Sequence, residues 1–240
     1  MKKFLFTLAC ISIGFFSSCS QEEIVSNNND GEVTSRAMLS SENKTMSISE
    51  FTSLVQDKAK PYELAFLESL PQDLKIYVFP QDSKQFSPLK EESFNTVKSL
   101  MKINNFSIKK DNSPINIIKS TSAKGITIPE SFQRELAVLE TMDFGDITLL
   151  GTFNYIYDVE NDKITEAKSL VCDLRDNPAG EFFYDWVDKG TSVTVSFDGL
   201  GLQYHVNGDV VLGVAIGDFP VGFVCYEVRQ LTGEEMLPPR

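Results

Sequence analysis

The sequence predicts an α+β protein in which an N-terminal helical part packs on a C-terminal antiparallel β-meander, forming an open sheet or a partial barrel. Apolar residues recur at helical spacing up to about residue 142, and they alternate with polar residues after Asp143. Turn dipeptides such as Asp198-Gly199 separate the alternating runs. We expect one α+β domain over residues 46–235, mainly helical at 46–142 and a meander at 143–232.

Helix-capping residues and prolines predict the elements of the N-terminal part. Ser47-Ile48-Ser49-Glu50 has capping-box spacing and predicts a helix at 48–59, and a second short helix is expected at 62–70. A strand is expected at 74–79. Ser87-Pro88 has the pattern of an N-cap and a first-turn proline, which predicts a third helix. The last predicted helix spans 129–142, with three apolar residues on its core face: Phe132, Leu136 and Leu139.

Alternation of apolar and polar residues, together with turn residues, predicts the strands of the meander. Strands are expected at 147–157, 164–174, 192–197, 200–206, 210–216 and 223–231. Asp198-Gly199 and Asn207-Gly208 have the composition of two-residue hairpin turns. The segment 177–187 fits either a helix capped by Asn177 or a turn followed by an aromatic strand.

The first nineteen residues resemble a bacterial lipoprotein signal. Met1-Lys2-Lys3 precedes an apolar run at 4–16 and Ser17-Ser18-Cys19, and this run is shorter than the ~20 residues that a membrane-spanning helix needs. The site is similar to the lipobox of Bacteroidota lipoproteins, whose cysteine is acylated and becomes the N-terminus. The resemblance implies a signal peptide at 1–18 and a lipidated Cys19.

The residues after Cys19 predict a tether and a destination. Residues 19–45 are rich in Ser, Asn, Asp and Glu, a composition that predicts a disordered linker between lipid and folded body. Ser20-Gln21-Glu22-Glu23 resembles the acidic tag that sends such lipoproteins to the outer face of the outer membrane. The expected location is therefore the outer membrane facing the cell exterior, with its periplasmic face as the alternative.

The negative net charge of the chain argues against nucleic acids and anionic membranes as partners. The chain carries 22 Lys and Arg against 34 Asp and Glu, and removing residues 1–18 takes away two lysines and no acid, which leaves a net charge of −14. Phosphate backbones and anionic lipids repel such a chain, so we expect no nucleic-acid partner and membrane attachment only through the N-terminal lipid.

Two cysteines, Cys172 and Cys225, remain besides Cys19 after signal removal. Outside the cytoplasm they can form a disulfide, which would stabilise the fold by ~4 kcal/mol in the chain-entropy model. Alternatively, both are buried thiols in apolar strands. The spacing of the two residues does not separate these alternatives.

No pattern in the sequence predicts catalysis, a cofactor or a metal. His205 is the single histidine and there is no Gly-x-Ser-x-Gly elbow. The segment 158–162 places oxygen ligands at alternate positions, but Lys163 stands where an EF-hand has glycine, so a solvated turn is expected. A glycosidase needs a pair of carboxylates, and five acidic residues could supply one: Asp173, Asp176, Glu181, Asp185 and Asp188. No motif selects two of them.

Aromatic residues at 182–186 are the best candidate contact surface. Phe182, Tyr184 and Trp186 lie next to Asp185, and flat rings beside a carboxylate suit sugar or protein recognition. The alternative interpretation is that these rings fill the core.

Three functions are compatible with these observations. The first is a surface-displayed, non-enzymatic lipoprotein that binds a protein or glycan partner. The second is a carboxylate-based glycan hydrolase. The third is a structural subunit that resembles fimbrillins, which are also lipidated precursors rich in strands.

Overall fold

The computed structural model describes residues 43–82, 84–109, 116–119, 127–141, 143–175 and 181–237. Internal contacts divide the chain into two units, 1–33 and 34–240, and all described residues belong to the second. The predicted signal peptide, the Cys19 lipobox and residues 19–42 of the predicted tether lie outside the described residues. Lys44 and Thr45, which fall within the predicted tether, form the start of strand β1.

The described residues are mostly antiparallel sheet. The strands are β1 (Lys44–Ser47), β2 (Lys75–Val78), β3 (Ile103–Ile108), β4 (Asn116–Lys119), β5 (Thr127–Thr141), β6 (Asp146–Asp158), β7 (Lys163–Arg175), β8 (Phe183–Asp188), β9 (Ser192–Val195), β10 (Gly201–Ile216) and β11 (Phe219–Met236). The helices are α1 (Ile48–Val55), α2 (Pro61–Glu68) and α3 (Phe94–Leu100), the last preceded by a 3-10 turn at Glu91–Ser93. None of the described helices is both long and apolar enough to cross a membrane.

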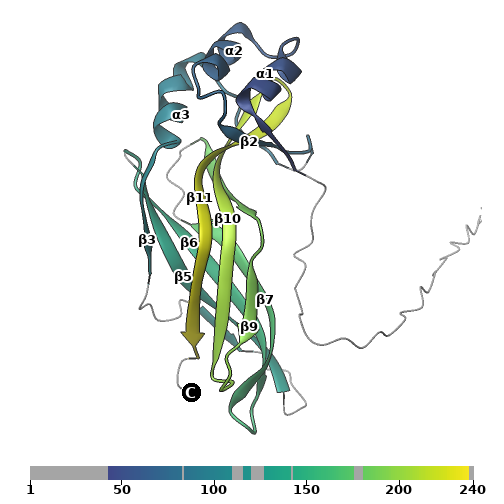
Figure 1. The fold of residues 1–240 in the computed structure, drawn as a ribbon, viewed down its shortest axis with the longest axis vertical. Coiled ribbons are helices and arrows are strands. Elements are labelled where there is room, and N and C mark those ends of the chain that lie inside the picture. The colour runs from purple at the N-terminus through teal and green to yellow at the C-terminus, as the bar shows by residue number, and fades with distance from the viewer. Residues whose placement is uncertain are drawn as a thin grey trace, which may run out of the picture. The chain divides into compact units, whose positions relative to one another are not determined.

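These strands form two open sheets rather than one meander (Figure 1). The first sheet has the order β1-β2-β11-β10-β8, and β9 pairs with β10 beyond the end of β8. The second has the order β3-β5-β6-β7, with β4 beside β5. The β10–β11 hairpin is the centre of the first sheet, with residues 201–216 paired to 219–236 around the turn at Gly217-Asp218.

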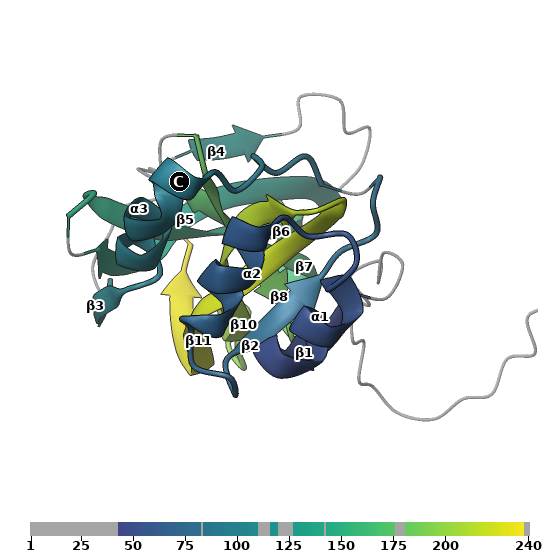
Figure 2. The ribbon, with the colours of Figure 1, turned by 90° about the horizontal axis from the view of Figure 1, so that it is seen from above.

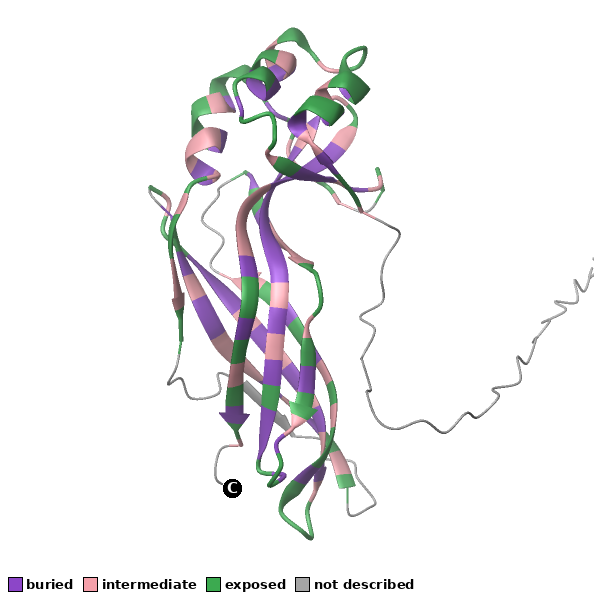
Figure 3. Ribbon diagram, viewed as in Figure 1, coloured by how far each residue is buried: buried purple, intermediate pink, exposed green. Residues whose placement is uncertain are grey.

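Side chains from both sheets share one apolar core. Phe153 of β6 meets Tyr204 of β10 with ring centroids 5.5 Å apart, and Phe106 of β3 stacks on Tyr226 of β11 at 5.2 Å. Buried residues alternate with more accessible ones along β6 from Leu149 onward and along β10 from Leu202 to Asn207, whereas residues 208–214 of β10 are all buried (Figure 3). The two sheets also meet through the backbone, because the Ile164 N–H at the start of β7 donates to the Gly199 carbonyl of the β9–β10 turn at 2.8 Å.

The three helices lie at the end of the first sheet where β10 turns into β11 (Figure 2). Phe51 of α1 meets Phe219 edge-on at 6.2 Å, and Phe66 of α2 meets Phe223 at 5.7 Å. The predicted capping box is confirmed, because Ser47 N–H donates to Glu50 Oε2 at 2.8 Å while Glu50 N–H donates to Ser47 Oγ at 3.3 Å.

The helix predicted at 129–142 is wrong, since these residues belong to strand β5. The β5–β6 register shifts between Glu135 and Ala137, so Leu136 is a bulged residue. A bulge reverses the alternation of faces. Phe132, Leu136 and Leu139 therefore all become buried at spacings of four and three, which imitates a helix.

Three further expectations need correction. Asn207-Gly208 is not a hairpin turn, because 201–216 is one continuous strand. Ser87-Pro88 does not begin a helix; Pro88 bridges to Ala215, and helical structure starts only at Glu91. Residues 46–142 are consequently not mainly helical, since β3, β4 and β5 fall within them. The segment that fitted either helix or strand forms strand β8 from Phe183 onward.

Candidate functional site

Strand β8 places the three predicted rings on the core side and Asp185 on the opposite face. Phe182 and Tyr184 are 2% and 4% exposed, and both belong to the core between the sheets. The Tyr184 hydroxyl donates to the Leu100 carbonyl at the end of α3, and burial raises the pKa of Tyr184. Because these two rings are buried, they fill the core and are not available to a ligand at the surface.

Asp185 lies among side chains on the outer side of β8. Its carboxylate pairs with the Lys84 ammonium, which also lies 5.7 Å above the ring of Phe79. Phe183, two residues earlier on the same strand, is 50% exposed. The four predicted contact residues are therefore not brought together on one surface.

Trp186 of β8 is partly buried and packs against the core. Its ring lies on Gly208 of β10, where a methyl group would come within 2.6 Å of the Trp186 Cη2 atom. The indole N–H is buried and has no hydrogen-bond partner among the described residues. Trp186 thus contributes apolar packing, with its polar atom left unpaired.

The two cysteines are free thiols that lie on different sheets, Cys172 on β7 and Cys225 on β11. The Cys225 thiol donates to the Phe223 carbonyl at 3.3 Å. Burial raises the pKa of Cys172 to about 12 and the pKa of Cys225 to about 12. Because the thiolate is the nucleophilic form, neither side chain is chemically activated.

The acidic residues proposed for calcium or glycan chemistry have local partners. Asp158 accepts the backbone N–H groups of Glu160 and Asn161 at 3.0 and 3.2 Å, as in a hairpin turn. Asp188 accepts two backbone N–H groups in the same way, from Gly190 and Thr191. Within the described ranges, no three acidic, histidine or cysteine side chains gather as potential metal ligands. Asp176 lies outside the described residues, and His205 is a partly exposed residue of β10.

One buried carboxylate that the sequence did not single out lies on the outer side of the first sheet. Asp209 of β10 is 1% exposed, and its Oδ2 atom accepts the Tyr77 hydroxyl at 2.7 Å and lies 2.5 Å from the Lys189 ammonium. The Asp209 Oδ1 atom has no partner among the described residues. Burial, and then the hydrogen bond to Asp209, raise the pKa of Tyr77. The cluster links β2 to β10 across β11.

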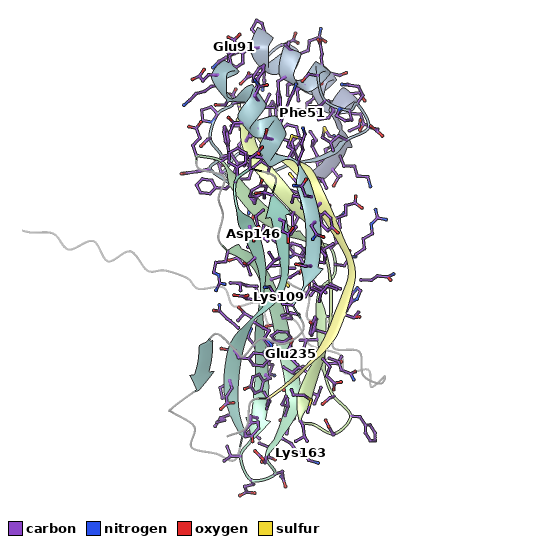
Figure 4. All side chains as sticks on the ribbon, turned by 90° about the vertical axis from the view of Figure 1, so that its left-hand side faces the viewer. Phe51, Glu91, Lys109, Asp146, Lys163 and Glu235 are labelled. Atoms are coloured by element: carbon purple, nitrogen blue, oxygen red, sulfur yellow. The ribbon has the colours of Figure 1, made fainter. Side chains whose placement is uncertain are left out.

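The most unusual surface feature lies at the opposite end of the sheets from the helices. Phe197, on the turn between β9 and β10, is fully exposed, and three other apolar side chains nearby are about half exposed: Val159, Leu200 and Met236. We call these four residues the distal apolar patch. Figure 4 labels Lys163, which adjoins the patch, near one end of the sheets and Phe51 near the other.

Backbone contacts bring the turns of the patch together. A methyl group on Gly199 would lie 3.3 Å from Lys163, which follows the Val159 turn on the β6–β7 hairpin. The Leu237 N–H donates to the Leu200 carbonyl at 3.1 Å, which places the end of β11 beside the β9–β10 turn.

The turn that carries Phe197 is held by its own polar residues. Asp198 accepts the Ser196 hydroxyl at 2.6 Å and the Leu200 N–H at 2.9 Å, and the Ser196 oxygen accepts the Gly201 N–H at 2.8 Å. The two hydrogen bonds that Asp198 accepts, the one from Ser196 first, lower the pKa of Asp198. Gly199 has a φ of 74°, which favours glycine. The exposed ring of Phe197 is thus carried by an ordered turn.

Acidic side chains lie around the distal apolar patch. Four carboxylates lie on the same two turns, with Lys163 beside them: Asp158, Glu160, Asp162 and Asp198. Sequence reasoning missed this site because Phe197 continues the alternation of a strand. The available signal was its position directly before Asp198-Gly199, where a turn residue has no sheet to cover it.

No family model, curated protein or solved structure matches this chain.

Proposed function

We propose that the protein is an outer-membrane lipoprotein, anchored through acylated Cys19 and facing the cell exterior, whose helix-bearing β body is a non-enzymatic binding module. The distal apolar patch is its contact surface for a protein or glycan. The observation that carries this proposal is the full exposure of Phe197 on an ordered turn beside three half-exposed apolar residues. Clustered exposed apolar groups with a polar rim mark interaction sites.

The position of the patch supports this role. The chain leads from Cys19 into β1, which pairs with β2; β2 in turn pairs with Val221–Phe223, next to the β10–β11 turn. The patch lies at the other end of β10, and because this strand has 16 residues, about 50 Å separate the two ends. An anchored body would therefore carry the patch well away from the point where its tether joins.

The chemistry of the patch defines a suitable partner. Full burial of a phenylalanine side chain contributes roughly 1.5–3 kcal/mol, so Phe197 alone can act as an anchor in a complementary pocket. The four carboxylates around it favour a partner whose pocket is bordered by basic or neutral hydrogen-bonding groups, and they disfavour anionic surfaces. A sugar ring stacked on Phe197 meets the same conditions.

The proposal is tested with a matched pair of phenylalanines. Wild type, Phe197→Ser and Phe183→Ser are applied to the same glycan and protein arrays, since Phe183 is 50% exposed but lies on β8, outside the patch. We expect a ligand that binds wild type and Phe183→Ser and that loses about tenfold or more in affinity with Phe197→Ser. The absence of any ligand, or equal affinity of all three proteins, would contradict the proposed site.

A structural subunit resembling fimbrillins is the second candidate function. The observation that favours it is the presence of two facing antiparallel sheets in place of the single meander expected from the sequence. If this candidate is correct, protein extracted from the cell surface should sediment as polymers containing many copies. Recovery of monomers only would exclude it.

A further inference from the structure

A groove lies on the first sheet where β2 and β11 part from each other. It has a volume of about 350 Å³, and its walls are two short segments: Pro71, Asp73, Leu74 and Lys75 on one side, and Val224, Cys225, Tyr226 and Glu227 on the other. All of these residues are described, and Glu227, the last of them on β11, lies about 30 Å along that strand from Met236 of the distal apolar patch. The groove is thus separate from the site proposed above.

The groove exists because β11 bends away from β2. The β2 register on β11 covers only Val221, Gly222 and Phe223. Immediately beyond, the β10–β11 register shifts between Val210 and Val211, which makes Cys225 the extra residue of a bulge. A bulge bends its strand and ends pairing on that edge. From Val224 onward, no described strand pairs with this edge of β11.

The phase of the ladder shows which backbone groups face the groove. The Phe79 N–H donates to the Pro220 carbonyl at 3.0 Å, so the backbone of Pro220 faces β2. Alternate residues of an antiparallel strand face the same neighbour. Gly222 and Val224 therefore face the same side, and Val224 is the first of them beyond the reach of β2.

We propose that this groove binds an extended peptide segment of a partner protein, which adds to β11 as a short strand hydrogen-bonded to the backbone of Val224. Strand β2 already uses the same edge over three residues, and the groove is the direct continuation of that pairing. Strand addition of this kind takes its affinity from main-chain hydrogen bonds and its specificity from pockets for alternate side chains.

The walls of the groove specify the peptide. Leu74 and Tyr226 offer apolar contacts on opposite sides, which fits a β-branched residue. Asp73 is exposed at the rim, whereas Glu227 pairs with Arg229 and lies 3.7 Å from the largely exposed Lys75. A lysine or arginine next to the β-branched residue would pair with Asp73, so the segment carries a basic residue beside a β-branched one.

The test uses the full ¹⁵N-labelled chain and the peptide acetyl-Lys-Val-Thr-Val-Lys-amide, followed by NMR. Two control peptides are matched to it: one with Glu in place of both Lys residues, and one with every backbone nitrogen methylated. We expect saturable shifts at the amides of 72–75 and 224–227, and affinity weaker by about tenfold for each control peptide. The methylated peptide keeps every side chain, so its loss reports the backbone bonds alone.

Protein variants give a second measurement. Val224→Pro should lose the binding, whereas Val224→Ala and Phe197→Ser should keep it, because neither of the latter removes the Val224 N–H. Proline is tolerated where the N–H faces an open edge, which is the position of Val224 beyond the three β11 residues that pair with β2. If Val224→Pro does not fold, the methylated peptide still tests whether binding depends on backbone hydrogen bonds.

Several outcomes would overturn the proposal. These are the absence of saturable shifts, shifts confined to the Phe197 turn, or equal affinity for the methylated peptide. Shifts at 224–227 that grow with protein concentration without peptide would assign the groove to a second copy of this chain instead.

Discussion

Gly208 provides the sharpest test of how β10 is packed, because two interpretations of the same residue predict opposite signs. As part of an Asn-Gly turn, it would need a positive φ, and alanine would be strained. In the structure Gly208 is a strand residue without positive φ, and its space is limited by the ring of Trp186.

The size of the effect follows from this geometry. Without the ring, Gly208→Ala would stabilise the fold by roughly 0.4–1 kcal/mol, since the unfolded chain loses freedom. A methyl group 2.6 Å from Trp186 Cη2 and 2.7 Å from Cε2 forces the ring or the strand to move, and overpacking costs about 1–3 kcal/mol. We therefore expect a net loss of about 1–2 kcal/mol in the free energy of unfolding.

The assay is a double-mutant cycle in urea. Unfolding is followed by far-UV circular dichroism for wild type, Gly208→Ala, Trp186→Ala and the double variant. Trp186 is the single tryptophan, so its fluorescence should also change in Gly208→Ala. In the Trp186→Ala background, Gly208→Ala should be neutral or stabilising, giving a coupling energy of about 2 kcal/mol. A stabilising effect of Gly208→Ala in wild type would refute the packing described here.

Three further predictions concern buried groups. Iodoacetamide at pH 8 should leave Cys172 and Cys225 unmodified in the native protein and alkylate both in urea without reductant; a requirement for reductant would show a disulfide. Because burial raises the pKa of Tyr204 and of both thiols to about 12, the unfolded chain releases these protons first, and the free energy of unfolding should fall as pH rises from about 9 towards about 12. Constant stability over this range would contradict those shifts. Asp209→Asn should cost about 1–3 kcal/mol in urea unfolding, because the Tyr77 hydroxyl loses a charged acceptor, and unchanged stability would show that the cluster contributes nothing.

Periodicity predicted the local structure correctly where the buried positions of a strand keep one phase. The β6–β7 register shifts twice along residues 163–175, but the buried positions Ile164, Leu170 and Cys172 still fall on alternate positions, and the expected strands fall within two residues of β6 and β7. In β5 the bulge at Leu136 changes the alternation, and a single sequence contains no mark that separates this pattern from a helix. The partner strand determines the bulge, so the difference becomes visible only in the paired sheet.

Long-range packing explains the other differences. Gly199 and Gly217 have positive φ and occupy turns, as their local sequences predicted. Gly208 has the same kind of neighbours, but Trp186 occupies the space beside it, and that contact comes from 22 positions earlier in the chain. Likewise, the sequence does not indicate which aromatic ring of β8 faces the core. Phe197 is recognised as a candidate contact residue only because the folded structure leaves its ring exposed.

The central claim is that Cys19 carries the lipid that anchors a displayed binding domain. The most direct measurement is mass spectrometry of the N-terminal tryptic peptide, taken from the protein extracted from producing cells with detergent. The account predicts a peptide of residues 19–36 whose N-terminal cysteine bears a thioether-linked diacylglycerol. An unmodified Cys19, or an N-terminus at Met1, would contradict it.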